Sequence, residues 1–305
     1  MITILDIGCR YGIFPKFKNN YQLIKYIGVD ADKSEINRLK KKYKNQPNLK
    51  FKFAFLGDKN KKILFNFYSH KGYSSSKKIN KNSLWFGQIR TNEDKIKKKE
   101  QINCLKSGNW ISKNIKGKII LKLDIEGGEL DFLKGLDLVN FKNIEAIIAE
   151  THFDRPFLTN SNFATISNFL TKKGYWISNM DLEHEKLSKY SIVNDYIPTS
   201  STTVFMKRKY QPKLFDINDS ENICITFYLL GMHALLIDYC KLIGFKKLKK
   251  IKIFERLKFV IGHRFNYLKK DPVFKYEDLN KEFMKMFNEN LPSMSNFNES
   301  LFFNP

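Results

Sequence analysis

Apolar runs that end at an acidic residue recur four times between residues 2 and 124. They are Ile2–Leu5 before Asp6, Tyr26–Val29 before Asp30, Leu49–Leu56 before Gly57-Asp58, and 118–123 before Asp124. Buried parallel strands show such continuous apolar runs, and open α/β sheets bind ligands at the carboxyl ends of their strands. The pattern predicts a parallel sheet whose carboxyl edge carries a group of acids.

The first of these runs leads into a turn that contains Gly8 and Gly12. We expect Gly8 to let the backbone pass close to a ligand and Gly12 to let a following helix pack tightly against the strand. The free N–H groups of such a turn attract anions. Arg10 stands where a dinucleotide-binding turn has its middle glycine, so a plain strand-to-helix turn is the alternative.

Asp30 lies 22 positions after Gly8, which is the spacing at which nucleotide-binding folds hold the hydroxyl pair of a ribose. A second interpretation is that it caps the charged helix expected at 33–44. We assign the ribose to Asp30 and the cap to Asp32. Asp58, after the third run, is expected near the rim of an adenine site.

Three carboxylates surround Gly127-Gly128 in the segment KIILKLDIEGGE. Burying Asp124, Glu126 and Glu129 at a strand end is costly unless a cation or hydrogen bonds compensate, so the cluster indicates a site. The alternative for Glu129 is that it only interacts with the dipole of a helix over 130–136.

The segments LDIGCRYG, YIGVDAD and FAFLGD, the serines at 74–76, and above all LKLDIEGGELDFLKGL resemble the FkbM family of S-adenosylmethionine-dependent methyltransferases. The family's hallmark, LKxDxEGxExxxLKG, matches Leu121–Gly135, and the resemblance spans Ile2–Lys207. It implies an α/β fold, the class I methyltransferase (Rossmann-like) seven-stranded sheet. It also implies S-adenosylmethionine as cofactor and, most often, a hydroxyl acceptor on a sugar or small metabolite. Cys9-Arg10 departs from the family, which commonly has Asn or a small residue there.

A sulfonium nucleoside requires an acid for its ribose, N–H donors, and carboxylate or aromatic groups for its positive charge. The residues expected to bind it are Asp6, Gly8, Arg10, Tyr11, Gly12, Asp30, Asp58 and Asp124.

Methyl transfer to a hydroxyl requires a base that removes the proton. The predicted catalytic residues are Asp124, Glu126 and His152, with Glu150 as a further candidate. A strand over 144–149 places Glu150 and His152 on one side and Thr151 on the other. The reference pKa of histidine suits a base, although a single histidine at a strand end is often structural. A Mg²⁺ ion on Asp124, Glu126 and Glu150 is an open alternative, and no zinc-type ligand spacing is present.

Further strands are expected at 174–178 and 202–207, and an amphipathic helix at 161–173, which completes a parallel sheet with an antiparallel edge. The insertion 63–116 is expected to begin with a strand and to continue as a mobile loop over 71–101. Tyr73 and Trp85 in this loop are candidates to stack on a sugar, and aromatic anchors of the loop are the alternative.

The methyltransferase domain is expected to cover 1–208 and a helical extension 209–305. Residues 216–245 show a long apolar helical pattern, followed by a basic helix over 246–270. The apolar stretch approaches the length that spans a bilayer, but His233 and Asp238 disfavour spanning. We expect a buried helix, with surface association, a cover over the acceptor side or a homodimer contact as open roles.

The formal net charge of +23 makes an RNA methyltransferase or RNA-binding protein the alternative function. Only seven of the 54 basic residues are arginine, the residue that nucleic-acid readers favour, and no NPPY-like tetrapeptide is present. We therefore interpret most of the charge as solvated surface and expect a small-molecule or glycan acceptor. A binding module without catalysis is disfavoured by the retained acids. Four scattered cysteines and the absence of a recognisable secretory signal favour the cytoplasm.

Overall fold

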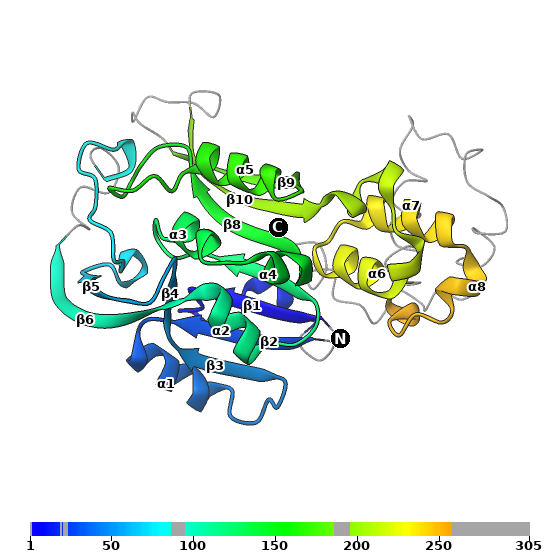
Figure 1. Ribbon diagram of the computed structural model, residues 1–305, viewed down its shortest axis with the longest axis horizontal. Helices are drawn as coiled ribbons and strands as arrows, with labels where there is room; N and C mark the ends of the chain where they lie inside the picture. Colours follow the sequence, from blue (N-terminus) through cyan, green and yellow to red (C-terminus); the bar gives the residue numbers. More distant parts are fainter. Residues whose placement is uncertain (1, 19, 21–23, 87–94, 186–195, 258–305) are drawn as a thin grey trace. The chain divides into compact units, whose positions relative to one another are not determined.

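Figure 1 shows a computed structural model of the chain, in which the described residues are 2–18, 20, 24–86, 95–185 and 196–257. The chain divides into two compact units, Met1–Arg208 and Lys209–Pro305. The first unit is built around a seven-stranded sheet, and the described part of the second is helical.

The large sheet has the strand order β3-β2-β1-β7-β8-β10-β9. Its strands are β1 (Thr3–Ile7), β2 (Lys25–Asp30), β3 (Leu49–Phe53), β7 (Ile119–Leu123), β8 (Ile144–His152), β9 (Tyr175–Glu185) and β10 (Ile197–Lys207). The pairs among β3, β2, β1, β7 and β8 are parallel, whereas β10 is antiparallel to both of its neighbours. The predicted fold class is confirmed. The predicted antiparallel edge is confirmed by the pairs of β10 with β8 and with β9; β9 is the edge strand, and β10 lies one strand inside it.

The order of the strands reverses between β1 and β7. From β1 the chain runs outward through β2 and β3, and it then returns to add β7 on the other side of β1. Ile7 is paired with Leu123, so Gly8 and Asp124 leave the sheet at the same level. In open α/β sheets this reversal is where the loops separate and a ligand crevice forms.

Four helices pack on one face of this sheet: α2 (Ser107–Asn114), α3 (Glu129–Lys134), α4 (Leu138–Asn143) and α5 (Phe163–Lys172). Their apolar residues form one core cluster with strand residues such as Leu5, Leu121 and Ile147. Each fully buried side chain of this kind stabilises the fold by about 1.5–3 kcal/mol. Outside this cluster, α1 (Lys33–Lys42) contacts β2 and β3 and buries Ile36 and Leu39.

The helix expected directly after Gly12 is not formed in the described residues between β1 and β2. They contain only a 3₁₀ turn, Pro15–Phe17. Phe14, which precedes the proline, has an extended backbone (φ −53°, ψ 131°), as the steric demand of proline on its predecessor requires.

A second sheet, of order β4-β6-β5, comprises β4 (Phe55–Gly57), β5 (Lys61–Tyr68) and β6 (Ile96–Lys106). The single strand expected over 49–56 is therefore wrong, because the chain leaves the large sheet at Ala54. The strand expected at the start of the insertion is confirmed as β5. The mobile loop expected over 71–101 is wrong in part, since 96–101 belongs to β6 and Ser75 and Ile79 form bridges to Asn66 and Phe157. Residues 87–94 lie outside the described residues.

The second unit contains α6 (Ser220–Leu229), α7 (His233–Ile243) and the short α8 (Phe245–Leu248). Its buried residues include Cys224, Phe227, Leu236 and Tyr239. The long apolar helix expected over 216–245 is wrong, because Gly231 has a positive φ of 70° and separates α6 from α7. A continuous basic helix from Lys246 is also wrong, since α8 ends at Leu248, and the part beyond 257 lies outside the described residues. No described helix is both long and apolar enough to cross a membrane.

Candidate active site

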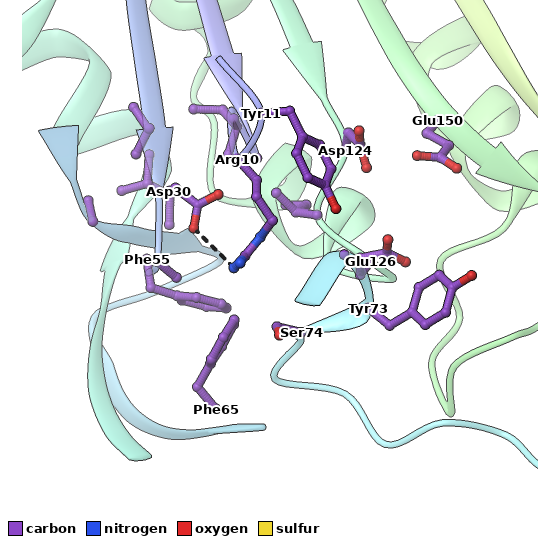
Figure 2. Close-up of a pocket in the computed structure, with 18 of the residues that line it drawn as sticks. Arg10, Tyr11, Asp30, Phe55, Phe65, Tyr73, Ser74, Asp124, Glu126 and Glu150 are labelled. Carbon is purple, nitrogen blue, oxygen red and sulfur yellow. Dashed lines mark ion pairs between the residues drawn. The ribbon is translucent and has the colours of Figure 1, made fainter. Parts of the chain in front are cut away.

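The carboxyl ends of β1, β2, β7 and β8 open into a cavity of about 250 Å³ (Figure 2). Of the residues predicted from the sequence, this cavity is lined by Gly8, Arg10, Tyr11, Asp30, Asp124, Glu126 and Glu150. Asp6, Gly12, Asp58 and His152 do not line it. Of the four acids expected at strand ends, the cavity therefore brings together Asp30 and Asp124 but not Asp6 and Asp58.

Gly8 is required by close packing of the β1 turn against the β7 loop. Its φ is +89°, and a Cβ atom there would lie 1.7 Å from the carbonyl oxygen of Asp124. The N–H groups of Gly8 and Cys9 donate to the carbonyl of Val29, and that of Gly12 donates to Cys9. These three N–H groups of the turn are therefore not free to bind an anion.

Asp30, at the end of β2, lies on one side of the cavity and pairs with Arg10, whose guanidinium nitrogen is 3.7 Å from the carboxylate (Figure 2). Its Oδ1 also accepts a hydrogen bond from the backbone N–H of Asp32 at 2.7 Å. Burial raises the pKa of Asp30 to about 6, although Arg10 opposes this rise. Asp32 caps α1 by accepting from the N–H groups of Ser34 and Glu35, as predicted.

An apolar slot adjoins Asp30. It is lined by Val29, Ala31, Ala54, Phe55, Leu56 and Phe65. The rings of Phe55 and Phe65 meet edge to face, with centroids 5.8 Å apart. An apolar slot next to a carboxylate suits a purine base with its ribose. Asp58 does not contribute to it: its carboxylate is 2.7 Å from Lys61 and lines a separate cavity of about 260 Å³.

Asp6 lies beneath the cavity floor, with only 1% of its surface exposed. It accepts a hydrogen bond from the Tyr26 hydroxyl and lies 3.4 Å from the Nζ atom of Lys122. Burial raises the pKa of Asp6, an effect that Lys122 opposes. The structure thus places Asp6 as a support of the site and not on its surface.

Lys122 belongs to the family motif at Leu121–Gly135, but the sequence analysis gave it no role in the site. Its Nζ atom lies 2.9 Å from Oδ2 of Asp124 and 5.4 Å from the centre of the Phe14 ring. Burial would lower the pKa of Lys122, but Asp124 and Asp6 outweigh it and raise the pKa. The available signal was a lysine within the otherwise apolar strand IILKL.

Asp124, Glu126 and Glu150 form a carboxyl cluster on the other side of the cavity (Figure 2). Burial disfavours ionisation of Asp124, but Lys122 and interaction with Glu150 hold its pKa below the usual value. Burial and the neighbouring Asp124 raise the pKa of Glu126 well above its usual value. The pKa of Glu150 is also raised well above its usual value, mainly by the Asp124 carboxylate and secondly by burial. Asp124 is therefore the ionised member, and the two glutamates hold protons more readily.

Glu126 has a positive φ of 54°, the only such value among the described residues other than glycine. Backbone strain of this kind costs about 1–3 kcal/mol and concentrates at functional sites. Glu129 holds the loop in this shape, because its carboxylate accepts from the N–H groups of Ile125 and Gly127 and from the hydroxyl of Ser161. Ser75 adds a hydrogen bond to the carbonyl of Glu126 at 2.7 Å.

The strand β8 carries Glu150 and His152 on one face, and Thr151 points to the other, where its hydroxyl lies 2.8 Å from that of Ser201. His152 lies beyond the cavity lining, with its ring centre 6.2 Å from that of Trp85. Burial lowers the pKa of His152. The structure therefore brings Glu150, and not His152, to the cavity.

The rim of the cavity carries aromatic side chains from the insertion. The rings of His70 and Tyr73 are in contact, tilted by 36° with centroids 4.3 Å apart. Tyr73, Gly72 and Ser74 line the cavity together with Tyr11. Tyr11 is 73% exposed. Of the two aromatic residues proposed for a sugar, Tyr73 lies at the cavity and Trp85 does not line it.

Residues 11–177, more than half of the chain, match the Methyltransferase FkbM domain. The chain belongs to the FkbM methyltransferase family. This confirms the resemblance inferred from the sequence, and the methyl donor of that family, S-adenosylmethionine, is the cofactor that the sequence predicted. No curated protein matches the chain.

Solved methyltransferase structures show only distant similarity to this family member. M. capricolum TrmK in complex with S-adenosyl-homocysteine is 12% identical, with 88% of this chain and 90% of that chain covered and a TM-score of 0.35. A SAM-dependent methyltransferase from Anabaena variabilis is 13% identical (68% and 77% covered, TM-score 0.33). M. jannaschii TYW2 in complex with AdoMet is 10% identical (68% and 70%, TM-score 0.31). The family assignment rests on the domain match alone.

The residues present fit the donor in two respects. Asp30 beside the apolar slot suits an adenosine, and the carboxyl cluster suits a positively charged sulfur. Within the described ranges, no group of three His, Cys, Asp or Glu side chains is arranged to hold a metal ion.

Proposed function

We propose that this FkbM-family methyltransferase transfers a methyl group from S-adenosylmethionine to a hydroxyl of a sugar, a glycan or a small metabolite. The observation that carries the proposal is the single cavity that joins an adenosine-type slot at Asp30 to the carboxyl cluster of Asp124, Glu126 and Glu150. A donor seated by its ribose at Asp30 would direct its sulfur toward that cluster.

When bound, the donor supplies a methyl carbon whose bond to sulfur breaks as the acceptor oxygen bonds to it. The chain's part is to align the two molecules and to take the hydroxyl proton. We assign the proton to the carboxylate of Glu126, because this residue lines the cavity on a strained backbone. The positive sulfur of the donor would favour its ionised form, and its raised pKa then favours proton uptake from the acceptor. Glu150 and Tyr73 would hold the acceptor next to it.

The acceptor half of the cavity favours a neutral or cationic molecule. Of the three carboxyl groups that line this half, Asp124 is the ionised member. Its negative charge disfavours a phosphodiester, which supports a sugar over RNA despite the net charge of +23. Aromatic faces such as Tyr73 suit the apolar faces of a sugar ring. We further infer a role in polysaccharide biosynthesis, a cytoplasmic location, and self-association or surface association through residues 209–305.

Donor binding tests the ribose assignment. We expect Asp30→Asn to weaken S-adenosylhomocysteine binding about tenfold or more, because hydrogen bonds to a charged group contribute about 1.5–3 kcal/mol. Titration calorimetry on the intact chain measures this affinity. Asp58→Asn is the matched control, since Asp58 lies outside the cavity, and equal losses in the two variants would refute the assignment.

A second experiment tests the acceptor class. The protein is incubated with methyl-labelled donor and with nucleotide sugars, free sugars or RNA, and label in each acceptor is counted. Label in a sugar supports the proposal, and label in RNA alone contradicts it. Donor binding without transfer to any acceptor would favour a binding module.

A further inference from the structure

A buried lysine supports the carboxyl cluster from below. Lys122 lies near the carboxyl end of β7, between Leu121 and Leu123, and only 7% of its surface is exposed. Taking an ammonium group out of water costs several kcal/mol unless paired charges compensate. An apolar residue at this position would avoid that cost. The charge of Lys122 therefore indicates a role in the cavity, whose lining residue Asp124 it contacts.

The two anions that contact Lys122 differ in their surroundings. Asp6 is fully buried, accepts a hydrogen bond from Tyr26, and does not line the cavity. Asp124 lines the cavity, and its side chain is 33% exposed. Lys122 contacts Oδ2 of Asp124 at 2.9 Å and Oδ1 of Asp6 at 3.4 Å. The shorter contact is with the group that faces the ligand.

We propose that Lys122 is a positioning residue of the methyl-transfer site: it keeps Asp124 ionised and fixed, and thereby leaves Glu126 as the group that takes the acceptor's proton. The inference rests on the proposed function. Without the ammonium, Asp124 would compete with both glutamates for the same proton, because like charges at close range cannot all ionise.

The other charged groups around the cluster do not replace Lys122. Glu150 and His152 of β8 both lower the pKa of Asp124, Glu150 through a side-chain hydrogen bond and His152 through its charge. The carboxylate of Glu183 on β9 raises the pKa of Glu150. Arg10, in the turn after β1, lowers the pKa of Glu126 by its positive charge. Its ion pairs, however, are with Asp30 and Asp32. Lys122 is thus the cation in contact with Asp124 within the described part of the chain.

Lys122→Met, Lys122→Arg and Lys118→Met test this role. Lys118 pairs with Glu145 at 2.9 Å, away from the cavity, so its loss controls for a missing ion pair elsewhere in the same sheet. Carboxyl ¹³C resonances of the ligand-free full-length protein are followed against pH. We expect Lys122→Met to raise the pKa of Asp124 by about 1–3 pH units, Lys122→Arg to restore it largely, and Lys118→Met to leave it unchanged.

The same variants are titrated with S-adenosylmethionine in two buffers of different ionisation enthalpy. At a pH between the parent and the raised pKa values of Asp124, Lys122→Met should release up to one more proton on binding than the parent protein, because Asp124 must then ionise. An unchanged titration of Asp124, or an equal shift in Lys118→Met, overturns the proposal. If the ligand-free shifts occur but no variant and no parent protein binds the donor, the proposed function fails while the pairing of Lys122 with Asp124 stands.

A second route covers the case in which Lys122→Met does not fold. Asp6→Asn removes the competing anion, so the ammonium acts on Asp124 alone and the pKa of Asp124 should fall further. A rise or no change in that pKa would contradict the proposed role of Lys122.

Discussion

At the scale of single residues, two glycines with a positive φ can be compared: Gly8 lines the cavity, and Gly174 lies between α5 and β9, outside the cavity lining. Gly8 has a positive φ and faces the carbonyl oxygen of Asp124, whereas Gly174 has a similar φ of +85° and no atom within 4 Å of the position that a Cβ would take. The pair separates the cost of a positive φ from the cost of a steric clash.

We predict that Gly8→Ala lowers the free energy of unfolding by about 3 kcal/mol or more, since the left-handed backbone costs about 1–2 kcal/mol and overpacking adds about 1–3 kcal/mol. Gly174→Ala should lower it by only about 1–2 kcal/mol. Urea denaturation of both variants measures the difference. Equal losses would show that the contact between Gly8 and the Asp124 loop does not constrain the turn.

The protonation of the glutamates predicts a pH dependence of donor binding. Glu126 and Glu150 have raised pKa values in the ligand-free cavity, so they hold protons at pH values where free glutamate is ionised. A cationic sulfonium favours their ionised forms. The affinity for S-adenosylmethionine should therefore rise as the pH increases above 4.5 and level off above the raised pKa values.

The neutral thioether of S-adenosylhomocysteine provides the comparison for this effect. The ratio of the two affinities should rise with pH in the parent protein and rise less in Glu126→Gln. Calorimetry across the pH range measures both ligands. A ratio independent of pH would mean that the sulfur binds away from the carboxyl cluster.

At the scale of elements, the loop between β7 and α3 is shaped by one buried carboxylate. Glu129 accepts from two backbone N–H groups and from Ser161, so Glu129→Ala should leave buried donors unsatisfied and lower the free energy of unfolding by about 3 kcal/mol. Asp131→Ala, on the same short helix, removes a partly exposed ion pair with Lys77 and should cost less than about 1 kcal/mol. Thermal and urea unfolding distinguish the two, and similar losses would contradict this role for Glu129.

Sequence patterns predicted the strands of the large sheet because their apolar runs are local. They did not predict that the run 49–56 splits, because β4 pairs with β6 through Phe55 and Cys104, partners far apart in the chain. The missing helix after Gly12 had a local signal in Pro15, which excludes a helical Phe14. The interior position of β10 follows from its pairing with both β8 and β9, partners that the sequence does not show.

The site was predictable to the extent that it follows strand ends. Asp30 and Asp124 follow the apolar runs of β2 and β7 and meet in the cavity, as parallel strands require. Asp58 and His152 also lie at strand ends, but neither lines the cavity. Asp58 follows β4, which belongs to the second sheet. His152 lies two residues beyond Glu150 on β8. Lys122 was missed because its partners, Asp6 and Asp124, come from two strands that only the fold brings together.

At the scale of the whole molecule, the net charge and the site have opposite signs. The chain carries +23 formally, yet the cavity holds four carboxylic residues, Asp30, Asp124, Glu126 and Glu150, and a single arginine. The global charge governs long-range attraction to acidic partners, whereas the acceptor is selected by the groups that it touches. For this reason the basic surface is weaker support for RNA as a substrate than the cavity is for a neutral acceptor.

The division into two units leads to a prediction about truncation. Every described residue that lines the cavity falls between Ile7 and Glu150, and the last strand of the sheet in chain order, β10, ends at Lys207. A fragment of residues 1–208 therefore keeps all seven strands and all of these lining residues. We predict that it folds and binds S-adenosylhomocysteine with the affinity of the full chain, within about twofold (~0.4 kcal/mol), as measured by calorimetry.

A fragment of residues 1–195 is the matched control, because it differs by only thirteen residues at the cut but lacks β10. Without β10, strand β8 loses its antiparallel partner and β9 loses its connection to the sheet, so this fragment should not fold cooperatively. If 1–208 fails as 1–195 does, the second unit is needed for the first to fold. If 1–208 folds but no longer binds the product, residues beyond 208 contribute to the donor site, and the cavity at the strand ends forms only part of that site.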